Sequence, residues 1–376
     1  MDINKIREQI DKTDDEILKL FIERMNLCGE IADYKRENGL SVTQKEREQE
    51  VLSRVAKATP DELKAASELL FKKVMDISKC LQCQRNTDTD EFSCLPLKQK
   101  EVVLACAGAT KSNTELACHK LFEDKQIRFY SDFSDVFSAV EKGEADYGVL
   151  PIGNRSVGEA FQIYRLLSKY DFYICKSAAI KVPYCLAAKK GTTEIMSIYS
   201  HEQALMQCSE HIRQQKGAKA YSCQNTALAA MMVRDSDDMT MAAICSPECA
   251  AYYGLEIIDG NVADNPDNAT GFICISKKPE IEENADIISI CIAIPDEVGS
   301  LSRLLTRFAY LGLNISRVES VPAPKGLHDV KGDILSGIVY IDFEGNINNP
   351  SVNRLLVDLK NEMKYYRFLG NYRHVD

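Results

Sequence analysis

Cationic side chains recur along the first amphipathic stretch of this 376-residue chain. Arg24 and Lys35 are 11 residues apart, and an α-helix that turns about 100° per residue places them within about 20° of each other on one face. Both side chains could therefore reach one ligand. Arg7 lies 17 residues before Arg24 and points about 100° away, so it cannot easily join that ligand from the same chain. It can serve a neighbouring chain instead.

Further polar side chains follow with a spacing that would align them. Arg47 and Glu48 are adjacent, and Ser78 and Gln82 are spaced i, i+4, which brings both to one face of a helix. Apolar residues three, four or seven positions apart predict one long helix over residues 3–34. Similar patterns predict helices over 43–58 and 60–84, the last with proline and acids in its first turn.

In this order the polar residues resemble the pattern of the all-helical chorismate mutases. That pattern is an early Arg, then an Arg and a Lys on the long helix, then Arg-Glu, then Ser-x-x-x-Gln, and it is present as Arg7, Arg24, Lys35, Arg47, Glu48, Ser78 and Gln82. The resemblance implies an intertwined homodimer in which the early Arg is donated across the interface. One family position that is often Asp is Gln44 here, and an amide can still hydrogen-bond the substrate.

The resemblance also implies a reaction. Chorismate is a dianion, and its rearrangement to prephenate is a unimolecular pericyclic step that requires no acid, base, nucleophile or cofactor. The protein must hold a compact conformer and stabilise charge on the ether oxygen. The arginines of the pattern would take the carboxylates. Lys35 and Gln82 would face the breaking ether bond, and Glu48 the ring hydroxyl. Most helix-surface cations are only solvated charges, and the ordered pattern is what favours catalysis.

After residue 85 the character of the sequence changes. Residues 86–99, NTDTDEFSCLPLKQ, have the composition of a linker. From 100 to 280, β-rich runs alternate with helical ones, which predicts an α/β sheet covered by helices. From 285 to 376 the order is strand, helix, strand, strand, helix, strand, the ferredoxin-like α+β arrangement. We therefore expect a multidomain chain with an all-α domain over residues 1–85.

The α/β segment resembles the prephenate dehydratases, whose two lobes flank a cleft as in periplasmic binding proteins. The matching segments are ADYGVLPIGN (145–154), IYSHEQAL (198–205), QNTALAA (224–230), AAICSPECAAYYGL (242–255) and DNATGF (267–272). By resemblance Thr226 and Thr270 are catalytic candidates, and Asn154 and Ser156 are candidates for substrate binding. Taken alone, each threonine is more often a turn or cap residue. For His201, a structural role in hydrogen bonding is about as well supported as a chemical role.

Two charged positions of the dehydratase pattern are missing. Gly153 replaces the acid of a Pro-Ile-Glu-Asn motif, Gly271 replaces the arginine of a Thr-Arg-Phe motif, and the first βα turn reads AGATKS. Removing carbon dioxide and hydroxide from prephenate needs a proton donor and positive charge or dipoles near the carboxylates. Each lost charge-assisted contact is worth roughly 1.5–3 kcal/mol. We therefore expect weak dehydratase activity unless Lys111 or Arg155 substitutes.

The last segment resembles the ACT domain, a module that binds amino acids at a dimer interface. In dehydratases phenylalanine is held by a Gly-Ala-Leu-type turn and a Glu-Ser-Arg-Pro motif. The corresponding residues here are Gly299, Ser300 and Leu301, and Glu319, Ser320, Val321 and Pro322. A glycine at a helix start suits the capture of a carboxylate by backbone N–H groups. Valine in place of arginine predicts weak or altered phenylalanine control. The alternative to amino-acid binding is that this segment serves only in the packing of the C-terminus.

The amino-acid composition further narrows the classes of protein to which this chain can belong. A net charge of −10 argues against a nucleic-acid surface. Residues 1–85 hold 16 Lys and Arg against 17 Asp and Glu, so this segment is better suited to an anion than the acidic remainder. No stretch reaches the roughly 18–20 apolar residues of a membrane span, and we expect a cytoplasmic protein. The 14 cysteines are mostly scattered in apolar segments, so we expect structural thiols and no metal site.

Three hypotheses remain open. The leading one is a bifunctional enzyme that makes phenylpyruvate from chorismate under phenylalanine feedback. The second is an active mutase whose dehydratase-like segment survives as a binding or regulatory module, which Gly153 and Gly271 favour. The third is a small-molecule sensor with a vestigial mutase, and the complete mutase pattern argues against it.

Overall fold

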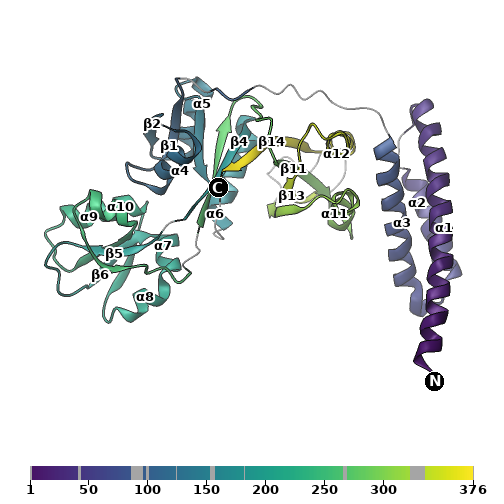
Figure 1. The fold of residues 1–376 in the computed structure, drawn as a ribbon, viewed down its shortest axis with the longest axis horizontal. Coiled ribbons are helices and arrows are strands. Elements are labelled where there is room, and N and C mark those ends of the chain that lie inside the picture. Colours follow the sequence, from purple (N-terminus) through teal and green to yellow (C-terminus); the bar gives the residue numbers. More distant parts are fainter. Residues whose placement is uncertain are drawn as a thin grey trace. The chain divides into compact units, whose positions relative to one another are not determined.

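The computed structural model describes residues 2–40, 44–85, 96–98, 101–123, 125–152, 157–181, 183–265, 269–321 and 335–375. The chain divides into two compact units, of which the first comprises residues 1–92 and 288–368 and the second residues 93–287 and 369–376. Figure 1 labels their helices and strands. The first unit therefore combines the helical segment with most of the C-terminal βαββαβ segment. Most of the predicted linker lies outside the described residues.

The helical part of the first unit consists of α1 (Ile3–Glu37), α2 (Lys45–Ala58) and α3 (Lys64–Arg85), with a 3-10 turn at Asp61–Leu63 before α3. α1 begins where the side chain of Asp2 accepts a hydrogen bond of 3.0 Å from the backbone N–H of Asn4. α3 packs against both α1 and α2. The three predicted helices are confirmed.

The βαββαβ part follows the predicted order. It consists of β11 (Ile287–Pro295), α11 (Ser300–Tyr310), β12 (Ile315–Val321), β13 (Leu335–Glu344), α12 (Pro350–Glu362) and β14 (Tyr366–Val375). β13 lies between β11 and β12 and is antiparallel to β12. The rings of Phe308 on α11 and Phe343 on β13 meet edge to face, with centroids 5.0 Å apart. α11 and α12 also contact α3.

The second unit has two α/β lobes. In the first lobe, β1 (Val103–Ala107) pairs in parallel with β2 (Gln126–Tyr130) and β3 (Tyr147–Pro151). β10 (Ala269–Ser276) runs antiparallel between β3 and β4 (Tyr173–Lys181), and the end of β14 pairs in parallel with β4. The connecting helices are α4 (Asn113–Leu121), α5 (Phe133–Lys142) and α6 (Val157–Tyr170). The predicted βαβ pattern is confirmed.

The second lobe is a sheet in the order β7-β6-β8-β5-β9. Its strands are β5 (Cys185–Ala188), β6 (Ser197–His201), β7 (Lys219–Cys223), β8 (Met241–Cys245) and β9 (Glu256–Gly260). Its helices are α7 (Glu202–Gln207), α8 (Ser209–Gln214), α9 (Thr226–Asp235) and α10 (Pro247–Tyr252). β5 and β8 are completely buried, which explains why small apolar residues dominate both.

Two further properties concern the described residues as a whole. No helix among them is long and apolar enough to cross a membrane. Their cysteines are free thiols, most of them buried, and no three His, Cys, Asp or Glu side chains within the described ranges gather as metal ligands would.

Candidate active sites

A hydrogen bond between Arg24 and Ser78 joins α1 to α3. Arg24 Nη1 donates to Ser78 Oγ and, at 3.5 Å, to the carbonyl oxygen of Val74. Ser78 Oγ donates to the same carbonyl at 2.7 Å, and Ser78 is buried. Arg24 Nε and Nη2 make no hydrogen bond to the described residues, so these donors remain available for an anion.

Lys35 is buried near the C-terminal end of α1, where only 8% of the residue is exposed. Burial lowers the pKa of its ammonium group, and the nearby Cys28 and Glu48 act in the opposite direction. A cation that has lost most of its water binds an incoming carboxylate or a developing oxyanion more strongly than a solvated cation does. Lys35 therefore suits the role that the resemblance gives it.

Glu48 of α2 and Gln82 of α3 complete a cluster around Lys35 and Ser78. Glu48 Oε1 lies 2.8 Å from Lys79 Nζ. Gln82 is 9% exposed and lies one turn after Ser78 on the same face of α3. The Oε1 atoms of Glu48 and Gln82 are both buried, and apart from the ion pair of Glu48 with Lys79, neither receives a hydrogen bond from the residues that the structure describes. Buried acceptors in this state suit a ligand that brings hydroxyl groups or other donors.

The remaining residues of the mutase pattern lie apart from this cluster. Arg47 is exposed on α2 and forms an ion pair of 2.8 Å with Glu50. Gln44 precedes α2, is exposed, and makes no side-chain capping hydrogen bond. Arg7 is exposed on α1, and 17 residues of helix at about 1.5 Å each separate it from Arg24 by roughly 25 Å. Of the mutase pattern, the described part of one chain brings together Arg24, Lys35, Glu48, Ser78 and Gln82.

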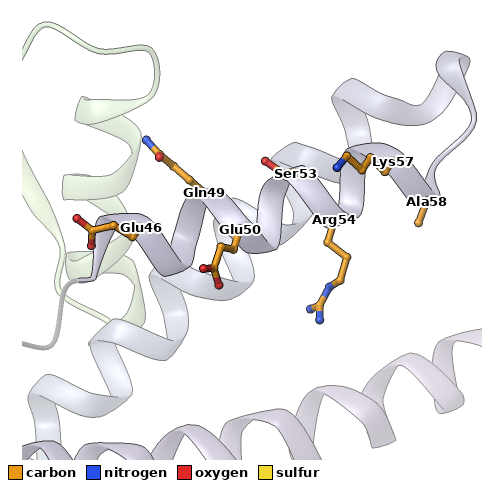
Figure 2. A pocket seen from close by; sticks show the side chains of 7 residues that line it. All are labelled: Glu46, Gln49, Glu50, Ser53, Arg54, Lys57 and Ala58. Carbon is orange, nitrogen blue, oxygen red and sulfur yellow. The ribbon is translucent and has the colours of Figure 1, made fainter.

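A separate open groove of about 790 Å³ runs along α2. Figure 2 shows its lining side chains, among which Glu50 and Arg54 project to the same side of the helix. The lining positions recur every three or four residues, so they form one face of α2: Glu46, Gln49, Glu50, Ser53, Arg54, Lys57 and Ala58. None of the residues of the mutase pattern lines this groove.

A cleft of about 250 Å³ in the second unit is lined by both of its lobes. Thr270 of β10 lines it from the first lobe, and Thr226 at the start of α9 lines it from the second. The structure therefore brings the two predicted threonines to one cavity. Asn154 and Ser156 lie outside the described residues, as do Gly153 and Arg155.

Helix starts supply much of the polar lining of this cleft. Ser112 caps α4 by accepting from the Glu115 N–H, and Asn225 caps α9 by accepting from the Leu228 N–H at 2.7 Å. Both caps line the cleft, so the positive ends of two helix dipoles are directed toward it. His201 also lines it, and its Nδ1 accepts from the Gln203 N–H at 3.4 Å as the cap of α7. This contact favours the structural interpretation of His201.

Positive side-chain charge is missing from the described lining of the cleft. No Lys or Arg is among those residues, and Asp132 contributes an acid. Gly271 is an ordinary strand residue of β10, and its carbonyl accepts from the Ile152 N–H at 2.8 Å. Lys111 places its ammonium 5.8 Å from the centroid of the Tyr252 ring, and it does not belong to the cleft lining. Carboxylates in the described cleft would therefore bind chiefly to backbone N–H groups and hydroxyls.

The predicted amino-acid turn lies at the start of α11. Gly299 has φ = 87°, a conformation that favours glycine, and Ser300 is buried while Leu301 is partly exposed. Glu319 on β12 binds the guanidinium of Arg317, with Nε 2.9 Å from Oε1. Ser320 and Val321 pair with Val339 and Ile338 of β13. Pro322 lies outside the described residues.

The sequence alone did not identify Lys79, Ser112 or Asn225 as site residues. Lys79 could not be selected by spacing, because its importance comes from the packing of α2 against α3. Ser112 and Asn225 carried a usable signal, since a small polar residue immediately before a helical run is typical of an N-cap. The cap positions gain meaning only when the two lobes place them at one cleft.

The chain is similar to known proteins along nearly its whole length. The model of chorismate mutase type II matches residues 6–83, and that of prephenate dehydratase matches residues 104–280. The bifunctional chorismate mutase/prephenate dehydratase of Aquifex aeolicus is 26% identical over 99% of this chain and 98% of that protein. The prephenate dehydratase of Methanocaldococcus jannaschii is 31% identical over 66% of this chain and 88% of that protein.

A solved structure supports the same assignment for the later part of the chain. The prephenate dehydratase of Arthrobacter aurescens, crystallised in complex with L-Phe, superposes with a TM-score of 0.66 and 28% sequence identity. The alignment covers 73% of this chain and 91% of that one.

Proposed function

This chain belongs to the prephenate dehydratase family and carries a type II chorismate mutase domain before the dehydratase domain, and on that premise we propose that it is a bifunctional enzyme. Its helical part converts chorismate to prephenate, and the cleft of its second unit converts prephenate to phenylpyruvate, the precursor of phenylalanine. The proposed domains are 1–85 for the mutase, 100–280 for the dehydratase and 285–376 for an ACT regulatory domain.

The mutase assignment is carried by the cluster of Arg24, Lys35 and Glu48 with Ser78 and Gln82. Two cations and two buried acceptors belong to this cluster, which suits a dianion that also carries a hydroxyl group. Arg24 binds a carboxylate, Lys35 stabilises charge on the ether oxygen, and Glu48 accepts from the ring hydroxyl. Holding a compact conformer in this charged setting is what a unimolecular rearrangement needs.

The helical part works as an intertwined homodimer. α1 leaves large apolar side chains uncovered, with Ile10 52%, Ile17 56% and Leu20 64% exposed. So extended an apolar face on one helix is unfavourable in water and marks an interaction surface. A second copy of α1 would cover it and bring the partner subunit's Arg7 toward the cluster, which the same chain's Arg7 is too distant to reach.

The dehydratase assignment comes from family membership, and the described cleft supports it only in part. Thr226 and Thr270 provide hydroxyls, and the capped starts of α4 and α9 provide dipoles for carboxylates. The glycine at position 271 leaves the cleft without the arginine of the family motif. We expect slow phenylpyruvate formation, and an active mutase with a binding or regulatory module is the second candidate that this glycine favours.

Phenylalanine is the proposed effector. The relative from Arthrobacter aurescens was crystallised with L-Phe. The turn at Gly299, Ser300 and Leu301 places a left-handed glycine at the start of α11, where the helix dipole favours a carboxylate. Valine at position 321 removes a charged partner for the carboxylate of the amino acid. Control by phenylalanine is therefore weaker than an intact Glu-Ser-Arg-Pro motif would give.

Product analysis tests the proposal. Purified protein is incubated with chorismate in one reaction and with prephenate in another, and chorismate, prephenate and phenylpyruvate are separated by chromatography. The bifunctional enzyme consumes chorismate, accumulates prephenate, and releases phenylpyruvate slowly from both substrates. A mutase with a binding module gives prephenate alone, and turnover of neither substrate rejects both candidates.

A further inference from the structure

Lys79 forms an ion pair at the mutase cluster, although it is not one of the residues of the mutase pattern. Its Nζ lies 2.8 Å from Glu48 Oε1, and the two side chains are only 16% and 29% exposed. At about 100° per residue, Gln82 projects from α3 between Ser78 and Lys79, and the three side chains span an arc of about 100°. Lys79 therefore lies at the edge of the cluster, on the side of α2.

The contact between Lys79 and Glu48 is an ion pair at hydrogen-bond distance. Apart from this ammonium, no described residue donates a hydrogen bond to Glu48 Oε1. A carboxylate offers about four lone-pair sites, so others remain available to a hydroxyl group of a ligand. Lys79 can hold the carboxylate in place without occupying the position that the ligand needs.

The charges around Glu48 come from several helices. α1 contributes Lys35, whose ammonium interacts with both Glu48 and Lys79. α3 contributes Asp76 and Lys73, and α11 contributes Arg303. Burial raises the pKa of Asp76, and Lys79 opposes that rise. Lys79 thus forms an ion pair with Glu48 within this group of charges.

A dianionic substrate makes this contact necessary. An ionised Glu48 repels the two carboxylates of chorismate, yet only the ionised form keeps both oxygens free to accept from the ring hydroxyl. A neighbouring ammonium offsets the repulsion and favours the ionised form. Without it, the Glu48 carboxylate would turn away from the cluster toward solvent.

We propose that Lys79 is a positioning residue of the mutase site, whose ammonium holds the Glu48 carboxylate over the cluster of Lys35 and Gln82 so that it accepts a hydrogen bond from the substrate hydroxyl. The inference rests on the proposed mutase activity and adds to it a residue that determines how the acceptor is presented.

Steady-state kinetics of the full-length protein test this role. Lys79→Met should lower kcat/KM for chorismate about tenfold near neutral pH, as expected for a largely buried charge contact that positions an acceptor. Lys79→Arg keeps the charge and should restore most of the rate.

Lys72→Met serves as the matched control, because Lys72 is exposed on the same helix and its replacement should leave the rate unchanged. An unchanged rate in Lys79→Met would overturn the inference while the mutase assignment stands. A loss that Lys79→Arg does not repair would also overturn it, since that result indicates packing. Circular dichroism of each variant verifies its helical content.

If the unmodified protein does not turn over chorismate, the proposed function fails, and the inference that rests on it fails with it.

Discussion

Arg24 donates a hydrogen bond to Ser78, a residue 54 positions away in the chain, and this contact joins the long helix α1 to α3 at the mutase cluster. The serine is buried, and its Oγ donates a hydrogen bond to the carbonyl oxygen of Val74. The guanidinium is therefore held by α3 before any substrate arrives. A cation fixed in this way loses less conformational entropy on binding than a free surface arginine.

The buried ammonium of Lys35 sets an upper pH limit on the mutase. Because burial lowers its pKa, the group loses its charge at a lower pH than an ordinary lysine. The charged form is the one that stabilises the ether oxygen, so kcat/KM for chorismate should be constant near neutrality and fall on the alkaline side. Lys35→Ala should lower kcat/KM by on the order of a hundredfold or more and remove this limb.

Measurements of kcat/KM for chorismate across roughly pH 6 to 10 check this prediction. Lys57→Ala is the control, because Lys57 is exposed on α2. A Lys35→Ala variant that keeps the unmodified rate would show that this lysine does not act on the substrate.

Sharing of the site between two chains predicts complementation. Arg7→Ala and Arg24→Ala chains should each be inactive, the first because it donates no arginine and the second because it lacks its own. Mixed dimers contain one site with both arginines, so mixing should restore about a quarter of the activity when the subunits exchange randomly. Half of the dimers are then mixed, and each mixed dimer has one intact site of two.

The mixing experiment needs an independent measure of exchange, such as mass spectrometry of chains with different isotope labels. Confirmed exchange without any recovery of chorismate turnover would contradict donation across the interface.

The glycine at position 271 should limit the dehydratase. Gly271→Arg returns a cation to β10 beside Thr270, and it should raise kcat/KM for prephenate by roughly 10- to 100-fold, the equivalent of one charge-assisted contact. Phenylpyruvate release from prephenate is the measurement. Gly260→Arg is the control, because a side chain at Gly260 of β9 would meet no atom within 4 Å.

A different result is equally informative. If the unmodified protein already shows a kcat in the ordinary enzyme range of roughly 1–1,000 per second, other residues supply the missing charge and Gly271 is not a loss.

Weak phenylalanine control should be repairable at β12. Val321→Arg restores the charge of the Glu-Ser-Arg-Pro motif, so calorimetric titration should show phenylalanine binding about tenfold tighter than in the unmodified protein. Val318→Arg is a matched control on the same strand, because Val318 is exposed. It lies three positions before Val321, and side chains alternate along a strand, so the two point to opposite faces. Tight binding and full inhibition in the unmodified protein would show that the valine does not weaken the site.

Much of the fold could be predicted from the sequence, because it depends on local periodicity. The helical spacing of isoleucines and leucines predicted α1, and the alternation of apolar and helical runs predicted the parallel strands β1, β2 and β3. The alignment of Ser78 with Gln82 followed from the same periodicity, and the structure adds that both residues are buried on α3. These features need only the geometry of one element.

Features that depend on how elements pack could not be predicted in the same way. The ion pair of Lys79 with Glu48 requires α2 to lie against α3 at one particular register. The association of the helical part with α11 and α12, through contacts such as Lys73 Nζ to Ser302 Oγ at 3.3 Å, has no signature in either segment alone. The convergence of Thr226 and Thr270 requires both lobes.

The rate of chorismate consumption, compared between the unmodified protein and Arg24→Ala, tests the mutase assignment most directly. Arg24 is half-buried and contacts Ser78, so the variant loses a charge directed at the substrate while α1 keeps its helical face. We predict rapid conversion of chorismate to prephenate by the unmodified protein and a loss of at least about a hundredfold in Arg24→Ala with unchanged circular dichroism. Equal rates in the two proteins, or no conversion above the uncatalysed reaction by either, would contradict the account.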